Sequence, residues 1–177
     1  MSFESDVVGL LPVLSRYARA LTGDAAWADD LVQDTAEHAL TRWRLWRPHS
    51  NLRAWLLTIL RNLFLDQLRQ HRKITTTSFD ETDEWRIVAT SQEAIDGLLL
   101  RDVQRALYRL PVDQREVLLL VGLEELSYQE AALVLKVPLG TVMSRLSRAR
   151  QQMHSLMTEQ GPGRSERPAL KVVRNTP

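Results

Sequence analysis

The chain has 177 residues, of which 44% are hydrophobic and none is cysteine, and its formal net charge is +1. This length accommodates one ordinary domain or two small ones, and the absence of cysteine excludes disulfides and thiolate metal sites. The sequence begins without a basic segment followed by an apolar core, and its apolar runs are too short to span a membrane, so we expect a cytoplasmic protein.

Charge is distributed unevenly along the chain. Residues 1–40 carry two basic and seven acidic residues, residues 41–73 eight and one, residues 74–100 one and six, and residues 127–153 four and one. Two basic blocks separated by acidic ones indicate two anion-binding surfaces and at least one surface that meets a different kind of partner.

Helical periodicity dominates the N-terminal part of the chain. Apolar residues recur at intervals of three and four from Leu10 to Leu21, which is the pattern of one buried helix face. Asp24 is a candidate N-cap for a second helix over residues 25–44. On this second helix, acidic and amide side chains form one polar stripe that is either a solvated face or a docking surface: Asp30, Gln33, Asp34 and Glu37.

The segment RWRLWRPHSNLRAWL, residues 42–56, combines three of the five tryptophans with four arginines. Its RPHSN portion ends the second helix, and a third helix is predicted over residues 52–72 with Ser50 or Asn51 as its cap. Aromatic faces stack on unpaired bases and arginines neutralise phosphates, so this composition suits the capture of single-stranded DNA. We expect Trp43 and Trp55 to be mostly in the core because both lie within predicted helices, and Trp46 to be more exposed because it lies in the loop.

A change of composition separates this part from the rest. Residues 73–92 are threonine-rich and acidic and lack a helical period, which predicts a flexible linker. The predicted fold is therefore all-α, with two small helical domains joined by a flexible acidic linker. The expected boundaries are an N-terminal domain over 1–73, a linker over 74–92, a C-terminal domain over 93–158 and a disordered tail over 159–177.

The segment LSYQEAALVLKVPLGTVMSRLSRARQQM, residues 126–153, has the pattern of a helix-turn-helix. Ser127 and Glu130 form an S-x-x-E capping box at the start of a short helix over 128–135. The segment KVPLG is a turn of the length that joins the two helices of this motif. The C-terminal domain is thus expected to contain a helix-turn-helix.

The second helix of this motif has two distinct faces. One is predicted to face the core and contains Val142, Leu146, Ala149 and Met153. The opposite, exposed face contains Ser144, Ser147, Arg148 and Gln151. Hydroxyl, amide and guanidinium groups bond both phosphates and base edges in the major groove, so this face predicts DNA binding; the alternative is a solvated basic helix.

In their order along the chain, the segments DDLVQDTAEHAL, LRAWLLTILRNLFLDQLRQHRK and LPVDQREVLLLVGLEELSYQEAALVLKVPLGTVMSRLSRAR resemble the extracytoplasmic-function (ECF) sigma factors of bacterial RNA polymerase. The resemblance extends over roughly residues 10–157. It implies an alternative sigma factor that binds core RNA polymerase, reads the −35 promoter element with the helix-turn-helix and melts the −10 element.

The resemblance also implies three sets of site residues. Docking on a coiled coil of the polymerase β′ subunit is assigned to Asp29, Asp30, Gln33 and Asp34. Recognition and opening of the −10 element is assigned to Trp46, Arg47, Asn51, Arg53, Trp55, Arg61, Asn62 and Arg69. Reading of the −35 element is assigned to Thr141, Ser144, Arg145 and Arg148.

Two positions depart from the pattern of the family. Met143 stands where a lysine or arginine usually precedes the Ser-Arg of the recognition helix, so a −35 contact is missing. Thr58 stands where many members have an arginine, which removes one expected −10 contact.

Other functions are weakly represented in the sequence. The four histidines have no metal-ligand spacing, and no phosphate loop or nucleophile motif occurs, so we expect no enzymatic activity and neither cofactor nor metal. Expected partners are the RNA polymerase core (its β′ coiled coil and β), promoter DNA and an anti-sigma factor, without membrane insertion. Two rival hypotheses are an ordinary helix-turn-helix regulator of duplex DNA and a sigma-like decoy that binds an anti-sigma protein.

Overall fold

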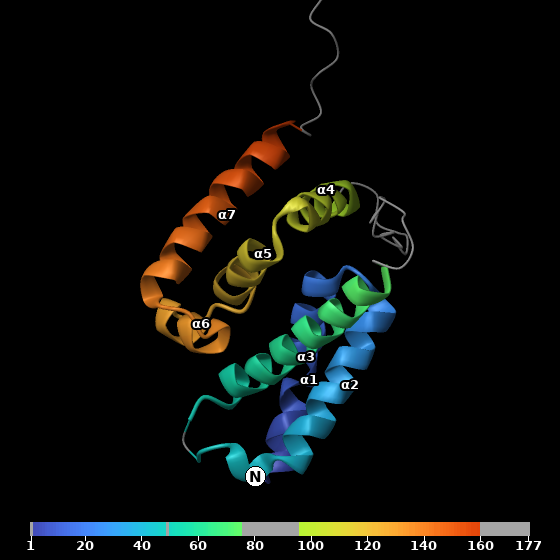
Figure 1. Ribbon diagram of the computed structural model, residues 1–177, viewed down its shortest axis with the longest axis vertical. Coiled ribbons are helices and arrows are strands. Elements are labelled where there is room, and N and C mark those ends of the chain that lie inside the picture. The colour runs from blue at the N-terminus through green and yellow to red at the C-terminus, as the bar shows by residue number, and fades with distance from the viewer. Residues whose placement is uncertain (1, 49, 76–95, 160–177) are drawn as a thin grey trace, which may run out of the picture.

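The computed structural model describes residues 2–48, 50–75 and 96–159 (Figure 1). All regular structure in these ranges is helical, so the predicted all-α fold is confirmed. The elements are α1 (Phe3–Thr22), α2 (Ala25–Thr41), η1 (Trp43–Leu45), α3 (Leu52–Thr75), α4 (Asp96–Arg109), α5 (Val112–Leu118), η2 (Leu119–Leu123), α6 (Tyr128–Leu135) and α7 (Leu139–Glu159). Nearly all of the predicted linker, and all but the first residue of the predicted tail, lie outside the described residues.

Helices α1, α2 and α3 form the N-terminal half of the molecule, in which each pair of helices is in contact. Asp24 caps α2 as predicted, because its carboxylate accepts a hydrogen bond of 2.8 Å from the backbone N–H of Trp27. The third helix is capped by Asn51, whose Oδ1 accepts from the N–H of Ala54. The largest fully buried side chains of this half are Leu14, Tyr17, Leu21, Leu31, Leu56, Leu57, Leu60 and Phe64.

Two predicted helix ends were wrong. α2 stops at Thr41 instead of continuing to residue 44, and the 3₁₀ turn η1 follows it. α3 continues to Thr75 instead of ending near residue 72. The first difference matters for the site because a 3₁₀ turn points its side chains in different directions from an α-helix.

Helices α4 to α7 form the C-terminal half, and α6 and α7 are the two helices of the predicted helix-turn-helix (Figure 1). The capping box is confirmed: Ser127 Oγ accepts from the N–H of Glu130, and a Glu130 carboxylate oxygen accepts from the N–H of Ser127. The expected core face of α7 is confirmed as well, since Val142, Leu146 and Ala149 are buried and Met153 packs against the core.

Replacing Ser127 with alanine is expected to lower the free energy of unfolding by about 1 kcal/mol, because the first turn of α6 loses its N-cap. Urea unfolding followed by circular dichroism measures this loss. Ser147→Ala, an exposed serine on α7, is the matched control and should leave the midpoint unchanged. Equal midpoints for the two variants would contradict a stabilising role for the cap.

The two halves are packed against each other. α1 contacts η2, and α3 contacts α6. At the C-terminal end of α1, Gly23 has a φ of +73° and lies so close to the ring of Tyr108 that an added Cβ would approach it within 2.8 Å. Arg115 also donates a hydrogen bond of 3.0 Å to the carbonyl oxygen of Leu21. The C-terminal end of α1 is therefore fixed against the C-terminal half.

Candidate nucleic-acid interface

The exposure of the tryptophans in residues 42–56 differs from the prediction. Trp43 is 52% exposed on η1, whereas Trp46 is half-buried and its ring lies 5.4 Å from that of Phe3. Phe3 also contacts Trp55 edge-on at 6.3 Å. The prediction for Trp43 and Trp46 was wrong because the 3₁₀ turn directs Trp43 outward, while the N-terminus of α1 covers Trp46.

A cavity of about 210 Å³ opens beside these aromatic residues, between α2, η1 and α3. Trp55, Ile59 and Leu63 supply apolar walls, and its polar lining comes from His38, Arg42, Asn62 and Asp66. An aromatic wall beside amide, carboxylate and guanidinium groups offers both stacking and hydrogen bonding to the edge of an extruded base.

The cavity brings together two of the predicted −10 residues, Trp55 and Asn62, and adds three that were not predicted. His38 and Arg42 lie four residues apart, as do Asn62 and Asp66, so each pair shares one helix face. That spacing was visible in the sequence, but the convergence of the two faces depends on the packing of α2 against α3.

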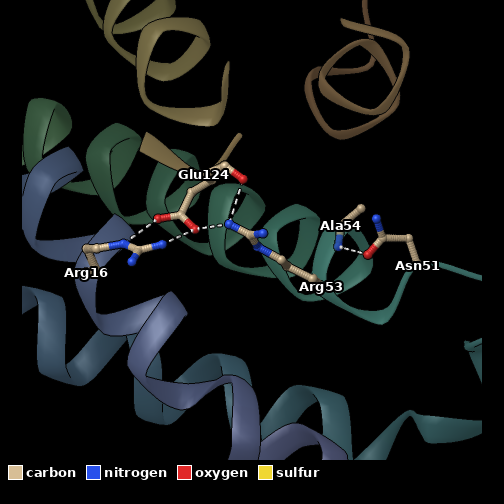
Figure 2. A network of polar contacts seen from close by, with 5 residues as sticks. All are labelled: Arg16, Asn51, Arg53, Ala54 and Glu124. Carbon is tan, nitrogen blue, oxygen red and sulfur yellow. Dashed lines mark hydrogen bonds and ion pairs between the residues drawn. The ribbon is translucent and has the colours of Figure 1, made fainter. Parts of the chain in front are cut away.

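Three other predicted −10 residues are bonded to the C-terminal half. Figure 2 shows the centre of this contact, where the fully buried carboxylate of Glu124 lies between Arg16 and Arg53. Arg16 donates to both carboxylate oxygens at 3.1 and 3.0 Å. Arg53 donates to the same carboxylate and, at 2.6 Å, to the backbone carbonyl oxygen of Glu124. The side-chain amide of Asn51 donates to the carboxylate of Glu130.

Arg61, the third of these residues, pairs with a buried glutamate of α5. Its Nε lies 2.9 Å from Oε1 of Glu116, and its Nη2 donates to Oε2 at 3.2 Å. Burial raises the pKa of Glu116 above its ordinary value, and the charge of Arg61 only partly offsets this increase. The remaining basic −10 candidates, Arg47 and Arg69, are exposed, although Arg69 forms an ion pair of 3.1 Å with Asp66.

A raised pKa means that folded Glu116 takes up a proton at a higher pH than the unfolded chain does. The contribution of this group to the free energy of unfolding therefore rises as the pH falls through the raised pKa towards the ordinary value of 4.5. We expect wild type to gain stability relative to Glu116→Gln between about pH 7 and about pH 5. Urea unfolding at both pH values measures the difference in the free energy of unfolding between wild type and Glu116→Gln, with exposed Glu125→Gln as the control. If this difference were the same at both pH values, the raised pKa of Glu116 would be contradicted.

The predicted −35 residues lie on or beside the outer face of α7. Ser144 and Arg148 are exposed, as are Ser147 and Gln151. Thr141 is half-buried, and Arg145 pairs with Asp113 of α5 at 3.3 Å. The Ser144 hydroxyl donates a hydrogen bond of 3.1 Å to the carbonyl oxygen of Thr141 and can still accept one. The exposed guanidinium of Arg148 lies one helical turn further along α7, so both groups can meet base edges or phosphates. Exposed Met143, which precedes Ser144 on α7, adds an apolar contact surface.

The predicted core-polymerase residues share one side of α2 but differ in accessibility. Asp29, Asp30 and Gln33 are exposed, and Asp29 forms an ion pair of 3.2 Å with Arg19. Asp34 is half-buried and accepts a hydrogen bond of 3.2 Å from the side-chain amide of Gln67. Three polar side chains on this stripe are thus accessible to a partner.

The described residues contain no group of three histidine, cysteine or acidic side chains that could hold a metal ion. None of the helices in the described part of the chain combines the length and apolar character needed to cross a membrane.

Comparison with known proteins accounts for both halves of this arrangement. Residues 100–153 match the family described as Sigma-70, region 4, and residues 7–61 match the Sigma2 domain of PhyR. The chain is 38% identical over 161 residues to the ECF RNA polymerase sigma factor EcfG of Rhodopseudomonas palustris (strain TIE-1), which covers 90% of this chain and 87% of the relative. It is 31% identical over 141 residues to SigM of Bacillus subtilis (strain 168), covering 80% and 86%.

A solved structure supports the same relationship. The sigma factor RpoE in complex with the anti-sigma factor NepR, from Bartonella quintana, aligns with a TM-score of 0.78 and 36% identity over 90% of this chain and 98% of that chain. A sigma-2 domain followed by a sigma-70 region 4 defines the sigma-70 class of transcription initiation factors. Within that class, the chain belongs to the ECF sigma factors of bacterial RNA polymerase.

Proposed function

We propose that this sigma factor opens its promoters by capturing an extruded base of the −10 element in the cavity between α2 and α3. The observation that carries this proposal is the cavity itself, in which Trp55 and Asn62 meet His38, Arg42 and Asp66. Unstacking a base step costs a few kcal/mol, and stacking on an aromatic side chain recovers about 1–3 kcal/mol per base. Exposed Trp43 on η1 offers a second stacking surface nearby.

The −35 element is read by α7 in this proposal. Ser144 and Arg148 make the principal contacts because both are exposed, whereas Arg145 must first leave Asp113. Met143 replaces a charged contact with an apolar one, which suits the methyl group of thymine.

Core RNA polymerase binds to the acidic stripe of α2 in the same proposal, through Asp29, Asp30, Gln33 and Asp34. The first three are exposed, and carboxylates on a helix surface suit a basic coiled-coil partner. The factor acts in the cytoplasm with the polymerase and supplies no catalytic group, cofactor or metal of its own.

An anti-sigma factor is the proposed regulatory partner. The aligned RpoE structure is a complex with the anti-sigma factor NepR, and CnrH, at 26% identity and a TM-score of 0.66, is in complex with the cytosolic domain of CnrY. Affinity purification from the native host followed by mass spectrometry tests this partner. Recovery of polymerase subunits alone under all growth conditions would contradict it.

The decisive experiment is transcription from fragmented genomic DNA by core polymerase with and without the purified chain, with sequencing of the transcript starts. New starts that share −35 and −10 elements are expected. The match to the Sigma2 domain of PhyR is also compatible with the rival hypothesis of a sigma-like decoy. A decoy would bind an anti-sigma protein and produce no new starts. An ordinary repressor would likewise produce none.

A further inference from the structure

Three of the eight candidate −10 side chains are bonded to glutamates of the same chain. Arg53 binds Glu124, Arg61 binds Glu116, and the amide of Asn51 binds Glu130. The three glutamates come from three consecutive parts of the C-terminal half: α5, the residue after η2, and α6. Carboxylates and phosphates are recognised by guanidinium groups through the same forked hydrogen-bonding geometry.

We propose that Glu116, Glu124 and Glu130 take the place of DNA phosphates in the free protein, so that the chain masks its own −10 face until the two halves part. This inference rests on the proposed −10 role of Asn51, Arg53 and Arg61. DNA and the C-terminal half then compete for the same side chains, and a partner that separates the halves releases them.

Glu124 is the centre of this closed arrangement. Its carboxylate is fully buried, whereas the side chains of Arg16 and Arg53 are 53% and 30% exposed. Arg16 is not among the DNA-binding candidates, and it donates to both carboxylate oxygens, so it holds Glu124 in position beside Arg53. η2 positions the glutamate locally, because the backbone N–H of Glu124 bonds the carbonyl oxygen of Leu119 in the wider π-helical turn.

Apolar packing between the halves is incomplete beside these charged contacts. A cavity of about 290 Å³ separates α3 from α5 and α7, and its lining includes Arg61, Leu65, Leu68 and Glu116. Contacts that lack close apolar packing depend more strongly on their charged pairs. Replacing the buried carboxylate of Glu124, which two arginines share, should therefore weaken the closed state more than it weakens either half.

Glu124→Gln is the principal variant, and Glu125→Gln is its control because this neighbour is exposed and the change in net charge is the same. The absence of cysteine allows dyes to be attached at Ala26→Cys on α2 and Ser155→Cys on α7, both exposed. Energy transfer between the dyes reports the separation of the halves. Fluorescence anisotropy with a short fluorescein-labelled single strand of mixed sequence, without polymerase, reports access to the −10 face.

The Glu124→Gln chain is expected to give lower energy transfer and about tenfold tighter binding of the single strand, if the open state of the wild type is populated to about one-tenth. Glu125→Gln should behave as wild type. Arg16→Gln, which removes a half-exposed partner instead of a buried one, provides a second way to weaken the closed state, with Arg19→Gln on the same helix as its control. Circular dichroism checks that each variant retains its helices.

Energy transfer equal to wild type in both Glu124→Gln and Arg16→Gln would overturn the proposal, and so would opening without any gain in single-strand binding. Failure of the proposed function looks different. In that case the opened variants bind the single strand more tightly, which supports the masking, but neither they nor the wild type initiate transcription with core polymerase.

Discussion

Replacing Phe64 with alanine is expected to lower the free energy of unfolding by about 3–5 kcal/mol, the usual cost of removing a large aromatic side chain from a core. Phe64 is 2% exposed, and its ring lies 5.3 Å from that of Trp27. It therefore joins α3 to α2, the two helices that line the proposed base-capture cavity. Thermal and urea unfolding measure the loss.

Leu100→Ala in α4 is the control for this variant, because Leu100 is 58% exposed and its truncation leaves no buried void. The loss at Phe64 should also reduce promoter opening at temperatures where the wild type is active, since α2 and α3 no longer hold the cavity in shape. A Phe64→Ala chain as stable as Leu100→Ala would show that the core of the N-terminal half is not formed as described.

Local sequence signals were sufficient for the helices and the helix-turn-helix. Asp24 and the Ser127–Glu130 capping box act within three or four residues of themselves, so their geometry follows from sequence alone. The core face of α7 follows from a period of 3.6 residues. By contrast, the residue at which α2 gives way to η1 depends on tertiary contacts, and an error of one turn there exchanged the expected environments of Trp43 and Trp46.

The contacts between the halves could not be predicted in this way. Glu124 and Glu125 are adjacent glutamates that look equivalent in sequence, yet the first is fully buried and the second is exposed. The difference arises from the π-helical turn and from Arg16, which lies 108 positions away along the chain. No local pattern encodes a pairing of that range, and the site residues Asn51, Arg53 and Arg61 were therefore predicted without their intramolecular partners.

The closed arrangement involves only part of the proposed −10 face. Asn62 and Arg148 are not bonded between the halves in the described contacts, whereas Asn51, Arg53 and Arg61 are. Under the two proposals, part of the −10 face is thus available before the halves separate and part only afterwards. Substitutions at Asn62 and Arg148 consequently test promoter recognition without disturbing the closed state.

Asn62→Ala and Arg148→Ala are expected to affect different steps of initiation. Loss of Arg148 should weaken binding of the polymerase holoenzyme to duplex −35 DNA by about fivefold to 150-fold, since a bidentate arginine–base contact contributes about 1–3 kcal/mol. Loss of Asn62 should leave that binding unchanged and reduce opening of the −10 element by about fivefold to tenfold, because one hydrogen-bonding group of the cavity disappears.

The two steps can be measured on one promoter identified by transcript sequencing. Gel mobility at low temperature reports duplex binding, and permanganate reactivity of unpaired thymines at higher temperature reports opening. Gln151→Ala, on the exposed face of α7 but outside the proposed −35 contacts, controls for a general change of that surface. A fork template with unpaired −10 bases should not restore Asn62→Ala fully, because the amide acts on the captured base after strand separation. Equal loss of duplex binding in both variants would mean that the cavity does not discriminate single-stranded from duplex DNA.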